Sequence, residues 1–248
     1  MNIQSTLRLF VPPIVTKLVQ SMRLNAVGPY KRDEFLSWLN FITPGMLSSS
    51  NLPLFNYSIR HMPESGAVVE IGSFAGLSLN HILHMMKQSG RSNPVLSVDE
   101  WHFEGASQGV IPGSSVTFAA YRDHVIETFK RNLMLFHADR LPYHVATSSD
   151  EFFSLWSKRA VVTDLFGRQT ELGGEIAMAH VDGDHTHEQS RRDFENIDRF
   201  LCPGGFIVFD DSADYSGWGS RLTAAEAGAR PDYEVVAKTP NYCVRKRA

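Results

Sequence analysis

The sequence has few cysteines, no excess of basic residues and no long apolar run. Cys202 and Cys243 are its two cysteines, and their spacing matches neither a zinc site nor a disulfide framework. Two isolated thiols are typical of a reducing compartment, so we expect a cytoplasmic protein. No run approaches the roughly 20 apolar residues that span a bilayer, and the N-terminus lacks the layout of a secretory signal.

Positive charge is also in short supply. The chain carries 24 Lys and Arg against 27 Asp and Glu, a formal net charge of −3 over 248 residues. This balance argues against a surface that tracks phosphates, so nucleic acid is not an expected partner. Residues 7–22 mix apolar side chains with Lys17, a pattern that suits either a membrane-surface helix or a packed amphipathic helix. We favour the packed helix, on its own domain or across a homo-oligomer interface.

Short β-type runs alternate with helical patterns from about residue 66 onward. The alternation predicts one α/β domain over residues 66–248, with a mainly parallel, Rossmann-like sheet and helices on both faces. Residues 1–65 are expected to form a mainly helical N-terminal extension or lid. Two β-type pieces near the end, 233–237 and 242–244, suggest an antiparallel pair at the sheet edge. The expected strands are 67–71, 95–98, 143–146, 176–181 and 206–209, and the expected helices are 77–87, 121–132, 151–156 and 188–200.

A glycine turn follows the first expected strand. Gly72 and Gly76 allow the backbone to approach a ligand closely, beside the free N–H groups of the next helix. Glu70, at the end of the strand, can accept a hydrogen bond from an amino-acid ammonium but would repel a pyrophosphate, and the G-x-G-x-x-G spacing is absent. Asp99 ends the next strand, where it can accept the two ribose hydroxyls of an adenosine. These features favour S-adenosylmethionine over a dinucleotide. The alternative is a tight turn without a ligand.

A second group of carboxylates follows two later strands. Asp182 and Asp184 come after the strand 176–181, and Asp210 and Asp211 after the strand 206–209. Parallel strands end at one edge of a sheet, so these side chains should converge there and raise one another's pKa values. Such hard oxygen ligands suit Mg²⁺, Ca²⁺ or Mn²⁺. The alternative is a set of solvated aspartates that cap helices.

The blocks 67–76, 180–194 and 201–211 resemble the macrocin-O-methyltransferase-like family of sugar O-methyltransferases, which belong to the class I S-adenosylmethionine-dependent enzymes. The resemblance spans roughly residues 40 to 248. It implies an O-methyltransferase that acts on a small-molecule acceptor, a hydroxyl of a sugar or glycosylated natural product. Segments 101–115 and 212–221 depart from the family pattern, and we expect them to determine the choice of acceptor. We interpret 101–115 as a lid or substrate-facing loop.

The resemblance also implies roles for particular residues. Metal ligation, usually of Mg²⁺, falls to Asp182, Asp210 and Asp211, and the general base to Asp184 or His185. His185 is favoured because its ordinary pKa lies near neutrality, although it can instead orient an aspartate. The expected cofactor-binding residues are Glu70, Gly72, Ser73, Gly76, Asp99 and Asp182, with Ser148 or Ser149 on the adenine side.

Other functions are weighed against this one. An NAD-dependent or hydroxylase-like Rossmann enzyme would use the same turn, but the dinucleotide spacing and any redox-cofactor motif are missing. A binding protein that has lost catalysis would not need carboxylates at all the strand ends, and this sequence keeps them.

Overall fold

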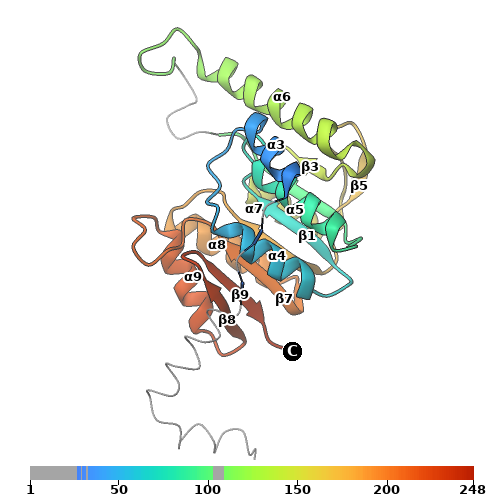
Figure 1. Cartoon of the computed structure of the whole chain (residues 1–248), viewed down its shortest axis with the longest axis vertical. Helices are drawn as coiled ribbons and strands as arrows, with labels where there is room; N and C mark the ends of the chain where they lie inside the picture. Colours follow the sequence, from blue (N-terminus) through green and yellow to red (C-terminus); the bar gives the residue numbers. More distant parts are fainter. Residues whose placement is uncertain (1–26, 29, 32, 103–108) are drawn as a thin grey trace, which may run out of the picture.

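The structure, a computed structural model, describes residues 27–28, 30–31, 33–102 and 109–248. In this part of the chain a seven-stranded sheet is covered by helices, with the C-terminal hairpin at one side (Figure 1). The amphipathic segment predicted at residues 7–22 lies outside the described residues. Among the described helices, none has the length and apolar character needed to cross a membrane.

The sheet has the strand order β3-β2-β1-β6-β7-β9-β8. From β3 to β7 all neighbours are parallel, whereas β9 is antiparallel to both β7 and β8. The chain moves one way from β1 to β3 and the other way from β6 to β7, so the direction of winding reverses between β1 and β6. Ligands of open α/β sheets bind at such a point. The predicted sheet, with its antiparallel edge pair, is confirmed. The strands are β1 (Ala67–Ile71), β2 (Val95–Val98), β3 (Tyr143–Val145), β6 (Ile176–Val181), β7 (Leu201–Phe209), β8 (Tyr233–Lys238) and β9 (Tyr242–Lys246).

Successive residues of the central strands point into two separate hydrophobic cores. Val68 of β1 packs in the core under α4 (Asn51–His61), α5 (Leu77–Gln88) and α6 (Phe118–His137). Its neighbour Val69 packs in the other core, under α7 (Ser149–Ser157), α8 (His187–Asp198) and α9 (Ser220–Ala229). Because side chains alternate across a strand, near-continuous apolar runs are needed to fill both cores, and the sequence provides them.

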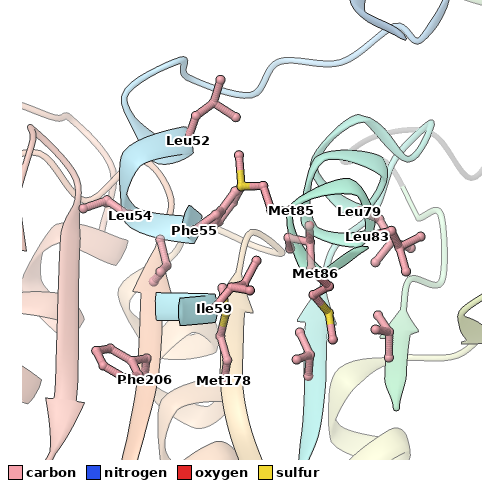
Figure 2. Close-up of a cluster of buried hydrophobic side chains, with 14 of the residues drawn as sticks. Leu52, Leu54, Phe55, Ile59, Leu79, Leu83, Met85, Met86, Met178 and Phe206 are labelled. Atoms are coloured by element: carbon pink, nitrogen blue, oxygen red, sulfur yellow. The ribbon is translucent and has the colours of Figure 1, made fainter. Parts of the chain in front are cut away.

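Helix α4 packs directly on the sheet. Its Leu54, Phe55 and Ile59 are fully buried and lie beside Met178 and Phe206 of the central strands (Figure 2). Helix α3 (Glu34–Ile42) packs against α5. Thus residues 51–61 share the core of the residues that follow, while the division of the chain at residue 65 stays a prediction.

Three features of the fold escaped the sequence patterns. Helix α9 buries only small residues, among them Thr223, Ala224 and Ala227, so no stripe of large apolar side chains marks it. The hairpin of β4 (Val161–Thr163) and β5 (Gln169–Glu171) has strands of three residues, too short for a visible alternation. The short 3₁₀ helix η1 (Ala138–Arg140) was not predicted either.

Part of the predicted lid loop is described. Residues 109–115 form a turn closed by a β-bridge between Val110 and Thr117 and by a hydrogen bond from Ile111 N to Val116 O of 2.9 Å. Residues 103–108 lie outside the described residues. The interpretation of 101–115 as a lid stays a prediction.

Candidate active site

The glycine turn after β1 brings the ends of two strands into close contact. Gly72 has φ +80°, and a Cβ at this position would lie 2.0 Å from the carbonyl oxygen of Asp182, so a side chain is excluded. Gly72 N donates a 2.9 Å hydrogen bond to Val98 O of β2. Gly76, with φ +87°, begins α5 without a side-chain cap. The turn follows β1, whose neighbours in the sheet are β2 and β6, and therefore lies where the direction of winding reverses.

Glu70 lies beneath this turn and is fully buried. One of its oxygens is 3.1 Å from His180 Nδ1, and the other accepts a 3.0 Å hydrogen bond from Ser73 Oγ. Both Glu70 and Ser73 were predicted to bind the cofactor. The Glu70 carboxyl group has no exposed surface and contacts the turn through Ser73. Sequence patterns gave no role to His180, which precedes Asp182 by two residues.

Asp99 fastens the turn to the end of β2. Its Oδ2 accepts hydrogen bonds from Ser73 N at 2.8 Å and Phe74 N at 2.9 Å, and its Oδ1 accepts one from Trp101 N at 2.7 Å. Burial raises the pKa of Asp99 above its ordinary value, while these N–H donors act in the opposite direction. Asp99 thus shapes the turn, and its contact with a ribose stays a prediction.

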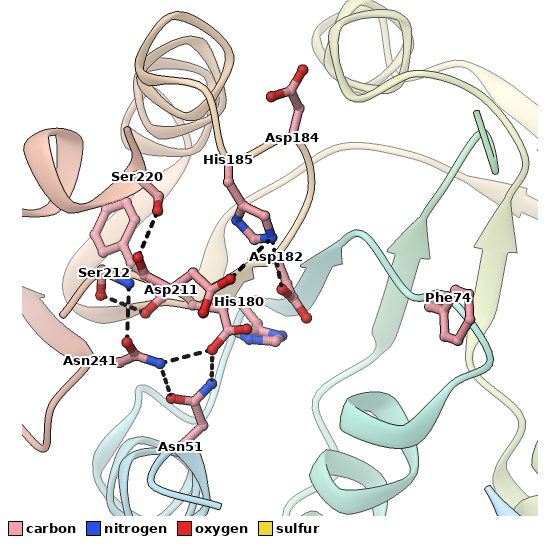
Figure 3. Close-up of polar contacts among 12 residues, drawn as sticks. Asn51, Phe74, His180, Asp182, Asp184, His185, Asp211, Ser212, Ser220 and Asn241 are labelled. Carbon is pink, nitrogen blue, oxygen red and sulfur yellow. Dashed lines mark hydrogen bonds and ion pairs between the residues drawn. The ribbon is translucent and has the colours of Figure 1, made fainter. Parts of the chain in front are cut away.

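Three of the four predicted aspartates, Asp182, Asp210 and Asp211, meet at the ends of β6 and β7, with His185 beside Asp182 and Asp211 (Figure 3). His185 Nε2 lies 3.9 Å from Asp182 Oδ1 and 3.8 Å from Asp211 Oδ2. Burial, followed by the charge of Asp210, raises the pKa of Asp182 well above its ordinary value. Burial and the same neighbour also raise the pKa of Asp211, and His185 opposes that rise. The convergence expected at this edge is therefore present for Asp182, Asp210 and Asp211 but not for Asp184.

Asp210 is held by two buried amides that sequence patterns did not identify. Its Oδ1 accepts hydrogen bonds from Asn51 Nδ2 and, at 2.8 Å, from Asn241 Nδ2. Asn241 Nδ2 also donates to Asn51 Oδ1 at 2.8 Å, so the three side chains form one network (Figure 3). Asn51 begins α4, and Asn241 lies in the turn between β8 and β9. No spacing along the chain links residues so far apart.

The remaining predicted residues have local partners. Asp184 is exposed, accepts a 2.7 Å hydrogen bond from Thr186 N and points away from the aspartates (Figure 3). Ser148 caps α7 by accepting a hydrogen bond from Glu151 N. Ser149 Oγ donates a 2.6 Å hydrogen bond to the buried Asp193.

The chemistry of the acidic cluster suits a hard divalent cation, because Asp182, Asp210 and Asp211 offer oxygen donors whose mutual repulsion a cation would relieve. Across the described ranges, however, no group of three or more His, Cys, Asp or Glu side chains is arranged to hold a metal ion. The magnesium site stays a prediction.

Fold and turn together define a Rossmann-like methyltransferase, and comparison with known proteins agrees. A family model described as a methyltransferase domain matches residues 69–212, from the glycine turn to just beyond Asp211. The chain belongs to this methyltransferase domain family, which confirms the predicted class of enzyme. A search of curated proteins finds no significant match.

Solved structures show the same fold at low identity. The O-methyltransferase TomG from Streptomyces achromogenes, in complex with S-adenosylmethionine, is 16% identical with a TM-score of 0.51, over 88% of this chain and 92% of that one. CalS11, a TDP-rhamnose 3′-O-methyltransferase of calicheamicin biosynthesis, is 15% identical with a TM-score of 0.51, over 96% and 98%. The methyltransferase PaMTH1 from Podospora anserina, bound to S-adenosylhomocysteine, is 12% identical with a TM-score of 0.55, over 96% and 97%.

Proposed function

We propose that the protein is an S-adenosylmethionine-dependent O-methyltransferase that acts on a hydroxyl of a sugar or glycosylated natural product with the help of a divalent cation. One observation carries the proposal. The glycine turn and the acidic cluster are adjacent, since the Cβ position of Gly72 is 2.0 Å from the Asp182 carbonyl oxygen. A methyl donor in the turn would lie beside the carboxylates. The similarity to TomG, CalS11 and PaMTH1 supports the cofactor and the oxygen acceptor.

Methyl transfer to oxygen requires a hydroxyl that loses its proton as the methyl group arrives. His185 is the proposed base, because its Nε2 faces the space between Asp182 and Asp211. Asp184 is the weaker candidate, since it points away and is bound to the local backbone (Figure 3). Asp182, Asp210 and Asp211 would hold the cation, which supplies Lewis-acid activation and orientation of the acceptor when bound.

The loop after Asp211 supports a ring-shaped acceptor. Trp218 is about half exposed, and its ring centre lies 5.4 Å from that of His185. Ser220 N donates to His185 O at 3.0 Å and Ser220 Oγ to Asp211 O at 3.0 Å, which fixes this loop beside the cluster. An exposed aromatic face suits stacking against a sugar or an aromatic ring. The similarity to CalS11 favours the sugar.

The proposal is tested by S-adenosylhomocysteine titration and by methyl-transfer assays over sugar and catechol acceptors, with Mg²⁺ or a chelator. We expect binding of S-adenosylhomocysteine and turnover that depends on Mg²⁺. Asp210→Ala should reduce turnover about 100-fold or more, because it removes a ligand and the residue that the two amides hold, while cofactor affinity changes little. Asp123→Ala, an exposed position on α6, is the control. Full activity of Asp210→Ala in chelator would remove the metal from the proposal.

The base is tested by pH–rate profiles of two variants. His185→Ala should lower kcat by about 10²–10⁴-fold and flatten the acidic limb of the profile, since general-base catalysis contributes on that order. Asp184→Asn should stay close to the wild type. A profile of His185→Ala that matches the wild type would pass the role to Asp184.

A further inference from the structure

A histidine of the sheet interior faces the end of β1 without any role in the chemistry described so far. His180 is fully buried, and Glu70 is its register partner on the neighbouring strand. Its Nδ1 is 3.1 Å from Glu70 Oε1. A carboxylate only accepts hydrogen bonds, so the His180 Nδ1 carries the proton and donates it. Within the described part of the chain, Nε2 has no hydrogen-bond partner. The Phe55 ring and the imidazole form a T-shaped contact, with ring centres 4.7 Å apart.

The contact with His180 determines what Glu70 presents to the glycine turn. With Oε1 held by the imidazole, Oε2 is directed at Ser73 and accepts its hydroxyl proton at 3.0 Å. Because its hydroxyl proton is directed at Glu70, the Ser73 oxygen offers only lone pairs on its other side, and the buried Glu70 carboxyl group lies behind it. The chain from His180 through Glu70 to Ser73 therefore makes this part of the turn an acceptor for a positively charged donor.

We propose that His180 is a positioning residue for the amino-acid end of the cofactor, because it fixes the Glu70 carboxylate that orients the Ser73 oxygen toward the ligand's ammonium group. The inference rests on the proposed function, since it takes S-adenosylmethionine as the ligand of the turn. Adenosine has no cationic group that calls for such an acceptor. Its predicted partner is Asp99, which follows β2.

A positioning role for His180 predicts different effects on two ligands, whereas a histidine that only fills space would affect both alike. S-adenosylhomocysteine and 5′-methylthioadenosine share the adenosine and the thioether sulfur, but only the first has an ammonium group. We expect His180→Leu to weaken S-adenosylhomocysteine binding by about tenfold, equivalent to about 1.4 kcal/mol. The affinity for 5′-methylthioadenosine should stay within about twofold. Both constants are measured by isothermal titration calorimetry on the full-length chain.

Further variants separate positioning from loss of fold. The amide nitrogen of His180→Asn can take the place of Nδ1 and should restore most of the affinity for S-adenosylhomocysteine, whereas His180→Gln cannot place a donor there and should behave like His180→Leu. If His180→Leu does not fold, the comparison of Gln with Asn gives the same answer. His137→Leu is the matched control, because His137 is another buried histidine whose Nε2 has no partner in the described structure, and it lies on α6. It should leave both affinities unchanged.

The outcomes are separable. Equal weakening of both ligands in His180→Leu, or no weakening of either, would overturn the positioning role while the proposed function stands. In a Glu70→Gln background, His180→Leu should have little further effect on S-adenosylhomocysteine, since the histidine acts through the carboxylate. A wild-type chain that binds neither ligand would overturn the proposed function, and the inference with it.

Discussion

Two buried carboxylates, Glu70 and Asp210, meet hydrogen-bond donors that offset the cost of their burial. Glu70 is held by His180 and Ser73, and Asp210 by two amides. A buried carboxylate without such donors would lose several kcal/mol of solvation, so these hydrogen bonds offset part of the cost of burial. Asp193 is the incomplete case. Its Oδ1 accepts from Ser149 and Gln189, but its Oδ2 has no hydrogen-bond partner in the described structure.

This imbalance predicts a pH-dependent stability. Burial raises the pKa of Asp193 to about 6, despite the two donors that lower it. A folded-state pKa above the unfolded value of about 3.9 means that the folded protein binds the proton more tightly. The stabilisation that the bound proton gives the folded protein is complete below pH 4. As the pH rises through 6 this contribution, up to about 3 kcal/mol, is lost. Asp193→Asn should remove this slope. Its free energy of unfolding, compared with that of the wild type, should therefore be more favourable at pH 8 than at pH 4.

The measurement is urea unfolding at a series of pH values. Glu195→Gln, which changes an exposed carboxylate on the same helix α8, serves as the control and should keep the wild-type slope. Parallel pH dependence of wild type and Asp193→Asn would show that Asp193 stays ionised in the folded protein.

At the scale of elements, strand ends that carry polar groups were predictable and partnerships between distant segments were not. Apolar runs end at Glu70-Ile71-Gly72, Asp182 and Asp210, and each such run indicates a strand and the sheet edge where that strand ends. The glycine turn and the acidic cluster could therefore be predicted from the sequence. Helix α9 and the β4–β5 hairpin lacked such contrast. His180 and the two amides act on partners 31 to 159 residues away, a relation that only folding reveals.

Close packing of short turns then sets the positions of the site's side chains. A Cβ on Gly219 would lie 2.2 Å from His187 N, so the loop after β7 is packed tightly against the start of α8. Together with the hydrogen bonds of Ser220, this contact places Trp218 beside His185. Loops held in this way by a rigid sheet are where binding residues are usually found.

At the scale of the whole molecule, three distant parts of the chain meet at one carboxylate. Asn51 comes from helix α4, Asp210 from the end of β7, and Asn241 from the hairpin of β8 and β9. All three side chains are buried, so removal of any amide leaves an oxygen of Asp210 with less compensation for its burial. The network therefore links the N-terminal helices and the C-terminal edge of the sheet to the candidate active site.

We expect this linkage to appear as energetic coupling. Asn51→Ala and Asn241→Ala should each lower the free energy of unfolding by about 1–3 kcal/mol, because each removes a donor to a buried charge. The double variant should lose less than the sum, by about 0.5–3 kcal/mol, since the two amides share Asp210 and contact each other. Urea unfolding of the four proteins gives the coupling, with Asn56→Ala on the same helix as the control. Strictly additive losses would mean that the helix and the hairpin are stabilised independently, and that Asp210 does not join them.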